Sequence, residues 1–202
     1  GDFDLTVNGD KQANKVAVFE EGSWKGLGSG LGNSSSQIVN TALAVGNDVY
    51  FGGVFAVPYG SANAKKNFAR WNGEVDFTEY APASTGGVTL QNTPREPVVA
   101  DKHFFLDYKG PSGDPYAFAQ IGDYIYMAGG FLTTAGDPNM KNLARFHLQW
   151  ERWEPVPGIN ANHANFIRAL HADAEGNLWV AGDFTSIGGV EAGKVAKFDP
   201  KT

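Results

Sequence analysis

The sequence YMAGGF at residues 126–131 decides the fold, because related copies of it recur along the chain. An aromatic residue, a glycine three positions later and a phenylalanine two positions after that also stand in YFGGVF at residues 50–55 and in WVAGDF at residues 179–184. The chain opens on GDF, which matches the end of the same motif. Such recurrence predicts a protein assembled from copies of one small structural unit.

Further segments accompany the copies in a fixed order. Fourteen to sixteen residues after the phenylalanine of the motif stands a second signature, which reads KVAVF, NFARW, NLARF and KVAKF in the four copies. In the first three units GSWKG, EVDFTEY or ERWEP follows this signature. The segments TALAVGNDVY, AFAQIGDYIY and RALHADAEGNLW lead into the glycine motif. The chain therefore contains three complete units and part of a fourth.

The spacing of the motif gives the size of the unit. Phe3, Phe55, Phe131 and Phe184 are 52, 76 and 53 residues apart, so the unit has about 52 residues and the second unit carries 23 more. The extra residues fall between Tyr80 and Tyr116. We expect repeat units at residues 3–54, 55–130, 131–183 and, in part, 184–202, with an insertion at residues 81–115.

Each unit is predicted to hold four short strands. Aromatic and branched residues alternate in VYFGGVF, FARWN and YIYMAGG, as they do on half-buried strands. Turn signals separate these segments at residues 46–48, 121–123 and 175–177, and Asn72-Gly73 predicts a two-residue hairpin. No segment sustains a period of 3.6 residues, so almost no helix is expected.

Four antiparallel strands in a unit of about fifty residues predict the blade of a β-propeller. Because one such sheet cannot cover both of its faces, neighbouring blades stack face to face. The predicted fold is all-β, with about three and a half four-stranded blades in a single region that spans residues 1–202. The motif glycines are expected where the backbone approaches a neighbour closely or forms a bulge.

Aromatic residues recur once per unit in fixed register. A residue that returns at the same place in every blade is expected to pack between sheets, although such aromatics could also form a surface for stacking sugars. These residues are Phe55, Trp71, Phe131, Phe146, Trp179 and Phe198. Asp2 and Asp183 precede the motif phenylalanine in two units, where a turn or edge role is expected.

The GGxF motif followed by NxARW resembles the kelch-like propeller repeats of bacterial surface proteins and of the fungal cortical-marker family. The resemblance covers nearly the whole chain and implies a propeller that serves as an interaction platform with varied partners. The chain departs from the pattern in its insertion and in its second unit, where VDFTEY replaces the tryptophan signature.

The two ends of the chain contain the same part of the unit, since it begins at GDF and ends just after VAKF. Propellers commonly close when the first strand completes the last blade, and these ends overlap instead of complementing each other. We expect the chain to be part of a larger propeller, with the further blades coming from a longer chain or another subunit. The alternative is a tight four-bladed ring. As an isolated piece it would expose apolar blade faces.

Charge and composition restrict the partners. The net charge of −6 repels phosphate backbones, so nucleic acid is not expected as a partner. The sequence contains no run of 18 apolar residues, so no membrane-spanning helix is predicted. The chain has no cysteine, which excludes disulfides and thiolate chemistry but leaves the compartment open.

No sequence signature predicts catalysis, a cofactor or a metal. The four histidines, His103, His147, His163 and His171, match no zinc spacing, and the chain contains no nucleophile elbow, phosphate loop or calcium loop. Carboxylates of a glycosidase would have to face each other across a cleft. The candidates for such a pair are Glu96, Asp101, Asp107 and Asp114, and loop solvation is the alternative role for them.

The insertion is the candidate binding site. Residues 88–116 combine aromatic and basic side chains, which interface hot spots and glycan platforms use, and insertions in repeat proteins often form the binding face. The predicted binding residues are Arg95, Lys102, Phe104, Phe105, Tyr108 and Lys109. A hairpin that only covers a blade edge, with KHFFLDY as its strand, is the alternative.

The sequence thus predicts a non-enzymatic extracellular or cell-surface module that binds a protein or glycan partner or supports assembly. Two alternatives remain open at this point. One is a carbohydrate-active propeller enzyme, a hydrolase or lyase with carboxylates on its axis, and the other is a structural subunit of a filament or coat.

Overall fold

A computed structural model describes residues 1–2, 4–7, 11–27, 30–31, 35–57, 65–71, 111–134, 137–159 and 166–201 of the chain. These residues form an all-β protein, in which the helical part is one short 3-10 segment at Pro138–Met140. The expectation of strands with almost no helix is confirmed for this part of the chain.

The strands form four main sheets and two separate hairpins, all with antiparallel pairing. The first sheet contains β3 (Ala17–Glu20) and β4 (Ser23–Gly26), and the second contains β5 (Ile38–Val45), β6 (Asp48–Val57) and β7 (Lys65–Trp71). The third contains β8 (Asp114–Ile121), β9 (Tyr124–Gly130), β10 (Leu143–His147) and β11 (Arg152–Glu154). The fourth contains β12 (Ile167–Ala172), β13 (Leu178–Gly182) and β16 (Val195–Phe198). The hairpins are β1 (Asp4–Val7) with β2 (Lys11–Asn14) and β14 (Ser186–Ile187) with β15 (Val190–Glu191).

The third sheet has the four strands predicted for a blade, two from the repeat unit at residues 55–130 and two from the unit at residues 131–183. Its order is β11-β10-β9-β8, so the chain runs up and down from one edge to the other. The predicted turns join the first two strands of three sheets, where Gly46, Gly122 and Gly176 have positive φ angles of 60°, 55° and 82°. The predicted hairpin at Asn72-Gly73 lies outside the described residues.

The motif glycine marks a β-bulge in each of three sheets. Gly53, Gly129 and Gly182 each lie opposite a register shift in the preceding strand. A Cβ atom on any of them would overlap a backbone carbonyl oxygen at the start of that strand or just before it, which for Gly129 belongs to Asp114. The sequence-based expectation of a bulge and a close backbone approach is confirmed, because no side chain fits at this point of the unit.

The first residue of the second signature has left-handed backbone geometry in all four units. Lys15, Asn67, Asn142 and Lys194 have φ angles of 65°, 67°, 58° and 74°. In the second and third units this residue is asparagine, which tolerates that region better than most residues. The Oδ1 atom of Asn142 accepts a hydrogen bond of 3.1 Å from the backbone N–H of Phe131. Asn67 holds Phe55 in the same way at 3.2 Å.

This geometry gives a prediction for Asn142. Asn142→Gly keeps the favourable backbone but removes the bond to Phe131, so we expect a loss of about 1 kcal/mol in the free energy of unfolding. Asn142→Ala also places a Cβ in an unfavourable backbone region, and we expect about 2 kcal/mol. Urea unfolding of the three proteins measures both values. Equal stability of the two variants would contradict the role assigned to the backbone angle.

Each pair of neighbouring sheets encloses its own hydrophobic core. Buried side chains from both partners fill each of the three junctions, so the protein has a series of cores instead of one centre. The buried residues include Leu31 and Phe55 at the first junction, Phe68 and Phe146 at the second, and Tyr126 and Leu178 at the third. The interior sheets bury both faces, since Met127 contributes to the second core and Tyr126 beside it to the third. This is the face-to-face stacking that the repeat predicts.

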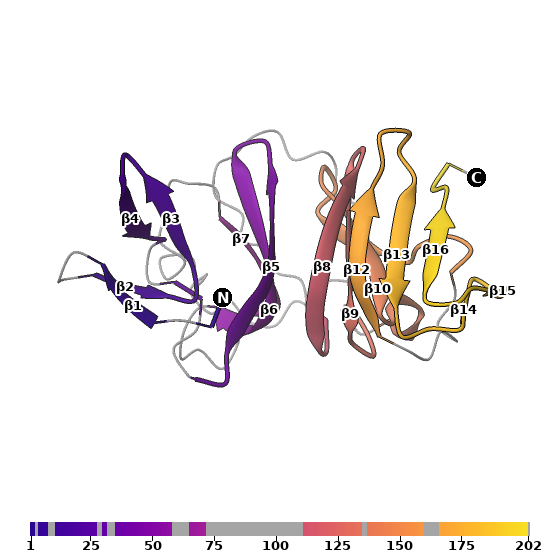
Figure 1. Cartoon of the computed structure of the whole chain (residues 1–202), viewed down its shortest axis with the longest axis horizontal. Coiled ribbons are helices and arrows are strands. Elements are labelled where there is room, and N and C mark those ends of the chain that lie inside the picture. Colours follow the sequence, from indigo (N-terminus) through magenta and orange to yellow (C-terminus); the bar gives the residue numbers. More distant parts are fainter. Residues whose placement is uncertain are drawn as a thin grey trace, which may run out of the picture.

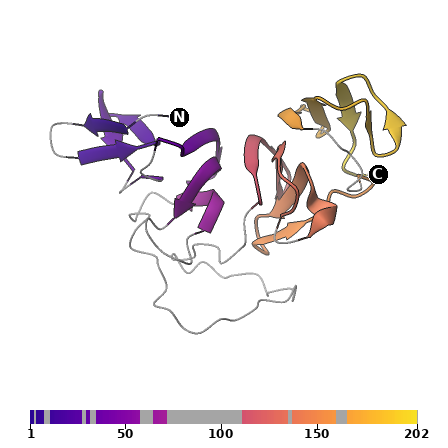
Figure 2. The ribbon, with the colours of Figure 1, turned by 90° about the horizontal axis from the view of Figure 1, so that it is seen from below.

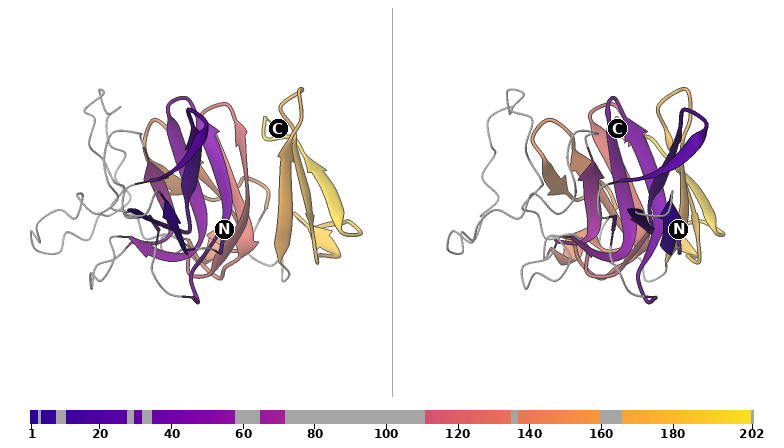
Figure 3. Two further views of the ribbon diagram at one scale, coloured as in Figure 1. Left: turned by 60° about the vertical axis from the view of Figure 1, so that its left-hand side comes forward. Right: turned by 90° about the vertical axis from the view of Figure 1, so that its left-hand side faces the viewer.

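The four sheets follow one another along an open arc (Figure 1). Strand β8 contacts β5 on one side and β12 on the other, so the first strands of successive sheets lie next to each other. Seen from below, the sheets spread outward from this inner row (Figure 2), and the side views show them stacked as layers (Figure 3). The first and fourth sheets lie at opposite ends of the molecule and do not meet within the described residues.

Candidate interaction site

The predicted binding residues lie in a part of the chain that the structure does not describe. Strand β7 ends at Trp71, and the described chain resumes at Pro111. Outside the described residues are the six predicted binding residues Arg95, Lys102, Phe104, Phe105, Tyr108 and Lys109, together with Glu96, Asp101, Asp107, His103 and His163. The end of the segment expected as an insertion is described, and Asp114 begins the first strand of the third sheet.

The point at which the chain rejoins the sheets after the insertion is tightly bonded. The Nδ2 atom of Asn67 on β7 donates hydrogen bonds to the carbonyl oxygens of Pro111, at 3.1 Å, and Gly113, at 3.0 Å. Asn40, the bulged residue of β5, donates to the carbonyl oxygen of Pro115 at 3.0 Å. Two side chains of the second sheet therefore hold the backbone that leads into the third. The described end of the insertion is thus fixed on the second sheet.

An ion pair crosses the same junction. The guanidinium of Arg70 on β7 lies 2.9 Å from Asp48 in its own sheet and 2.9 Å from Glu151 in the turn between β10 and β11. Burial raises the pKa of the neighbouring Tyr50 to about 12, so its hydroxyl stays protonated at neutral pH. The junction thus combines an aromatic core with polar bonds at its edge.

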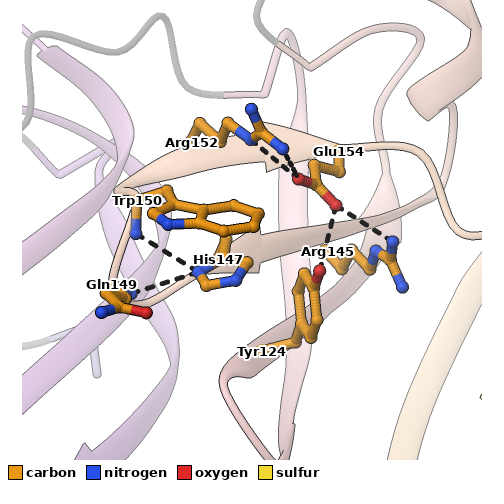
Figure 4. A network of polar contacts seen from close by, with 7 residues as sticks. All are labelled: Tyr124, Arg145, His147, Gln149, Trp150, Arg152 and Glu154. Atoms are coloured by element: carbon orange, nitrogen blue, oxygen red, sulfur yellow. Dashed lines mark hydrogen bonds and ion pairs between the residues drawn. The ribbon is translucent and has the colours of Figure 1, made fainter. Parts of the chain in front are cut away.

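A second polar cluster lies on the third sheet and is shown in Figure 4. Both arginines of this cluster donate to the carboxylate of Glu154: Arg152 Nε at 2.8 Å and Arg145 at 3.0 Å. The hydroxyl of Tyr124 also donates to Glu154, at 3.3 Å. Its two oxygens are therefore held by residues of three neighbouring strands.

Aromatic rings connect the two arginines of this cluster. The guanidinium of Arg152 lies 4.7 Å from the ring centre of Trp150, and that ring stacks on His147 at 4.0 Å with an interplanar angle of 16°. His147 packs edge-on against Tyr124 at 4.7 Å, and Arg145 covers the other face of Tyr124 at 4.2 Å. The result is one column with a cation at each end and one carboxylate that bonds to both.

The protonation states in this column suit a structural role. Burial opposes ionisation of Glu154, but the hydrogen bonds and charges of Arg152 and Arg145 outweigh it and lower the pKa of this carboxyl. Burial also lowers the pKa of His147, whose Nδ1 accepts hydrogen bonds of 3.2 Å from the backbone N–H groups of Gln149 and Trp150. Glu154 is thus anionic and His147 neutral at pH 7.

The lowered pKa of Glu154 predicts a pH dependence of stability. A folded-state pKa below the unfolded value adds stability that is present above the unfolded pKa and is lost as the pH falls through the folded pKa. We therefore expect Glu154→Gln to lower the free energy of unfolding by about 1 to 2 kcal/mol at pH 7 and by less at acid pH. Chemical unfolding of both proteins at pH 7 and at successively lower pH measures the difference in their free energies of unfolding. A difference that does not shrink as the pH falls would contradict the prediction.

Sequence reasoning did not find this column or the ion pair of Arg70. The sequence did contain a signal, because in three units a basic residue stands three positions after the asparagine or lysine that begins the second signature. These residues are Arg70, Arg145 and Lys197. Its partners could not be read from the chain, since Arg70 and Glu151 are 81 positions apart. In the described residues no group of three His, Asp or Glu side chains is placed to hold a metal.

The repeat aromatics pack between sheets as predicted where a sheet has a neighbour. Phe55, Phe131 and Phe146 are buried, and Trp71 and Phe198 pack at the margins of cores. Trp179 differs, because 40% of its surface is exposed. It occupies the side of the fourth sheet that faces away from the third, where no described sheet follows.

A scan of protein-family descriptions, a search of curated proteins and a search of solved structures each found no match to this chain. Among the described residues, no helix has the length and apolar character needed to span a bilayer.

Proposed function

We propose that this chain is part of a β-propeller and acts as a non-enzymatic extracellular or cell-surface module that binds a protein partner through its insertion. The sheets supply a rigid frame, since every junction between them has its own buried core. Further blades, from a longer chain or from another subunit, extend this frame. The proposal follows a general pattern, in which repeat proteins carry their binding residues on insertions and loops.

One observation carries the proposal: the described chain before the insertion, at β7, and after it, from Pro111, is held on the junction between the second and third sheets. Asn67 bonds to the backbone where the chain returns, and Arg70 ties β7 to the third sheet through Glu151. A segment between two braced elements can be presented to a partner without disturbing the sheets. Its composition, with Phe104, Phe105 and Tyr108 beside basic residues, suits a protein interface.

Photo-crosslinking tests the proposal. A photoreactive amino acid replaces Tyr108 in one protein and Leu132, an exposed residue of the third unit, in a matched control. We expect position 108 to crosslink a protein that mass spectrometry identifies, and position 132 not to do so. Binding is then measured with the purified partner and a variant that lacks residues 88–109 but retains Pro111 and Gly113, the acceptors of Asn67.

The outcomes separate the possible ligands. Loss of partner binding in the deletion variant, with an unchanged circular dichroism spectrum, supports the proposal. Unchanged binding after the deletion, or equal crosslinking at both positions, contradicts it. A panel of neutral and acidic oligosaccharides, followed by tryptophan fluorescence, tests the glycan alternative, and saturable binding that needs the insertion would replace protein by glycan as the ligand.

A further inference from the structure

The two ends of the arc expose apolar side chains at positions that are buried inside it. In the first sheet, Phe19 is 60% exposed and Trp24 is 55% exposed. In the fourth sheet, Trp179 is 40% exposed and Val195 is 52% exposed. Phe19 and Trp24 lie on opposite strands of one hairpin and their rings touch, with centres 5.3 Å apart. Each end therefore presents an apolar face of a sheet.

The junction between the second and third sheets shows what such positions contact. The second sheet contributes Tyr50 and Phe68 to it, and the third contributes Phe146 and Trp153. The ring of Phe68 lies 5.4 Å from that of Phe146 and 4.8 Å from that of Trp153, and Tyr50 lies 6.3 Å from Phe146. This aromatic cluster forms the centre of the second core.

The exposed residues hold the same repeat positions as this cluster. In the motif and the second signature, Trp179 and Val195 of the fourth sheet correspond to Tyr50 and Phe68. Phe19 is the last residue of its signature, as Phe146 is, and its cross-strand partner Trp24 corresponds to Trp153, the partner of Phe146. The two end faces are thus the two halves of an interior junction, and they lie at opposite ends of the molecule.

The charges at the two ends are complementary in the same way. In the interior junction Arg70 of the second sheet pairs with Glu151, which lies in the turn before the last strand of the third sheet. Lys197 holds the position of Arg70 in the fourth sheet, and its Nζ lies 5.5 Å from the ring centre of Trp179 and 3.6 Å from Asp173, as Arg70 also pairs with Asp48 in its own sheet. Glu20 ends β3 and Glu21 follows it in the corresponding turn of the first sheet, where Lys25 lies 3.0 and 3.1 Å from their carboxylates. The fourth sheet therefore presents a cation, and the first sheet presents two carboxylates beside one lysine.

We propose that the exposed face of the fourth sheet binds the exposed face of the first sheet in a second copy of the chain, head to tail. Trp179 and Val195 cover Phe19 and Trp24, and Lys197 pairs with the carboxylates beside them. The contact repeats an interior junction between two molecules, so it buries the same kinds of side chain. It rests on the propeller architecture proposed above and does not involve the insertion.

Sedimentation velocity of the 202-residue chain measures the association. We expect a monomer of 21.6 kDa at about 1 μM and species of two or more copies at about 200 μM. Trp24→Glu and Trp179→Glu each place a charge in the contact, and we expect each to raise the dissociation constant about a hundredfold. The matched control is Leu132→Glu, which changes a residue that is 69% exposed and lies on neither end face. It should associate like the original chain.

Mixing the two variants tests the head-to-tail arrangement. The Trp24→Glu protein keeps an intact fourth sheet, and the Trp179→Glu protein keeps an intact first sheet. We expect the mixture to form a dimer with one contact, although neither protein associates alone. In a separate pair, Lys197→Glu should weaken association about threefold, and adding Glu20→Lys and Glu21→Lys to the same chain should restore it.

Three results would overturn the proposal. One is a chain that stays monomeric over the whole concentration range. The same result is expected if the two end faces bind each other within one molecule or bind a different partner, and both cases contradict the proposal. A second is association that survives either tryptophan variant alone, because that indicates contact between like faces. A third is a mixture that stays monomeric. Since crosslinking from the insertion is measured separately, failure here and failure of the proposed binding function can be told apart.

Discussion

Phe146→Ala is expected to lower the free energy of unfolding by about 4 kcal/mol. The side chain is fully buried at the centre of the second core, where Phe68, Tyr50 and Trp153 surround it. Truncation removes apolar contact area and leaves a cavity between two sheets whose backbones cannot easily move together. Because the side chain belongs to one junction, the local stability should fall most in the second and third sheets. Urea unfolding followed by tryptophan fluorescence measures it.

The matched control for this change is Phe19→Ala, since Phe19 ends the same signature in the first sheet and is exposed. We expect a loss below about 1 kcal/mol, measured at a concentration at which the chain is monomeric. Hydrogen exchange of the second and third sheets gives a further readout, because Phe146→Ala should speed exchange on both sides of the junction. Equal losses for the two variants would contradict the assignment of the second core.

Gly129→Ala is expected to lower the free energy of unfolding by about 3 kcal/mol and the melting temperature by roughly 6 to 12 °C. The new methyl group would overlap the carbonyl oxygen of Asp114 across the bulge. Since the atom in its way belongs to the backbone of β8, the overlap is relieved only by moving the two strands apart. Differential scanning calorimetry measures the change.

Gly193→Ala is the control for this glycine, because nothing lies within 4 Å of the position that its Cβ would take. Its stability should stay within about 0.5 kcal/mol of the original chain. Gly53→Ala and Gly182→Ala meet the same obstacle as Gly129→Ala, in the second and fourth sheets, and should behave like it. A harmless substitution at any of the three would show that the bulge is not an obligatory part of the unit.

The repeat made the local structure predictable from the sequence. A glycine that returns at one position implies a backbone constraint, and the bulges opposite Gly53, Gly129 and Gly182 are that constraint. A phenylalanine that returns at one position implies packing, and Phe55, Phe131 and Phe184 are all buried. The surroundings of Phe3 lie outside the described residues, but Gly1 before it donates to the carbonyl oxygen of Lys15, as Gly129 donates to that of Asn142.

The side-chain contacts between units were not predictable from the sequence. The repeat identifies equivalent residues, but it does not show which side chains of neighbouring sheets contact each other. The pairing of Arg70 with Glu151 depends on the turn between β10 and β11, where the third unit has its own sequence. The column from Arg152 to Arg145 likewise belongs to the third sheet alone. Periodicity also gave no reason to treat Trp179 differently from Tyr50 and Tyr126, although only the two tyrosines are covered by a following sheet.

The bonds of Asn67 to Pro111 and Gly113 have a consequence for how this protein can change. They hold the return of the chain on the strand that it left at Trp71. The entropy lost on closing that excursion grows slowly with its length, by about 0.6 kcal/mol for each doubling. Lengthening the excursion should therefore cost the sheets little. The position between β7 and β8 is a natural place to graft a new recognition element.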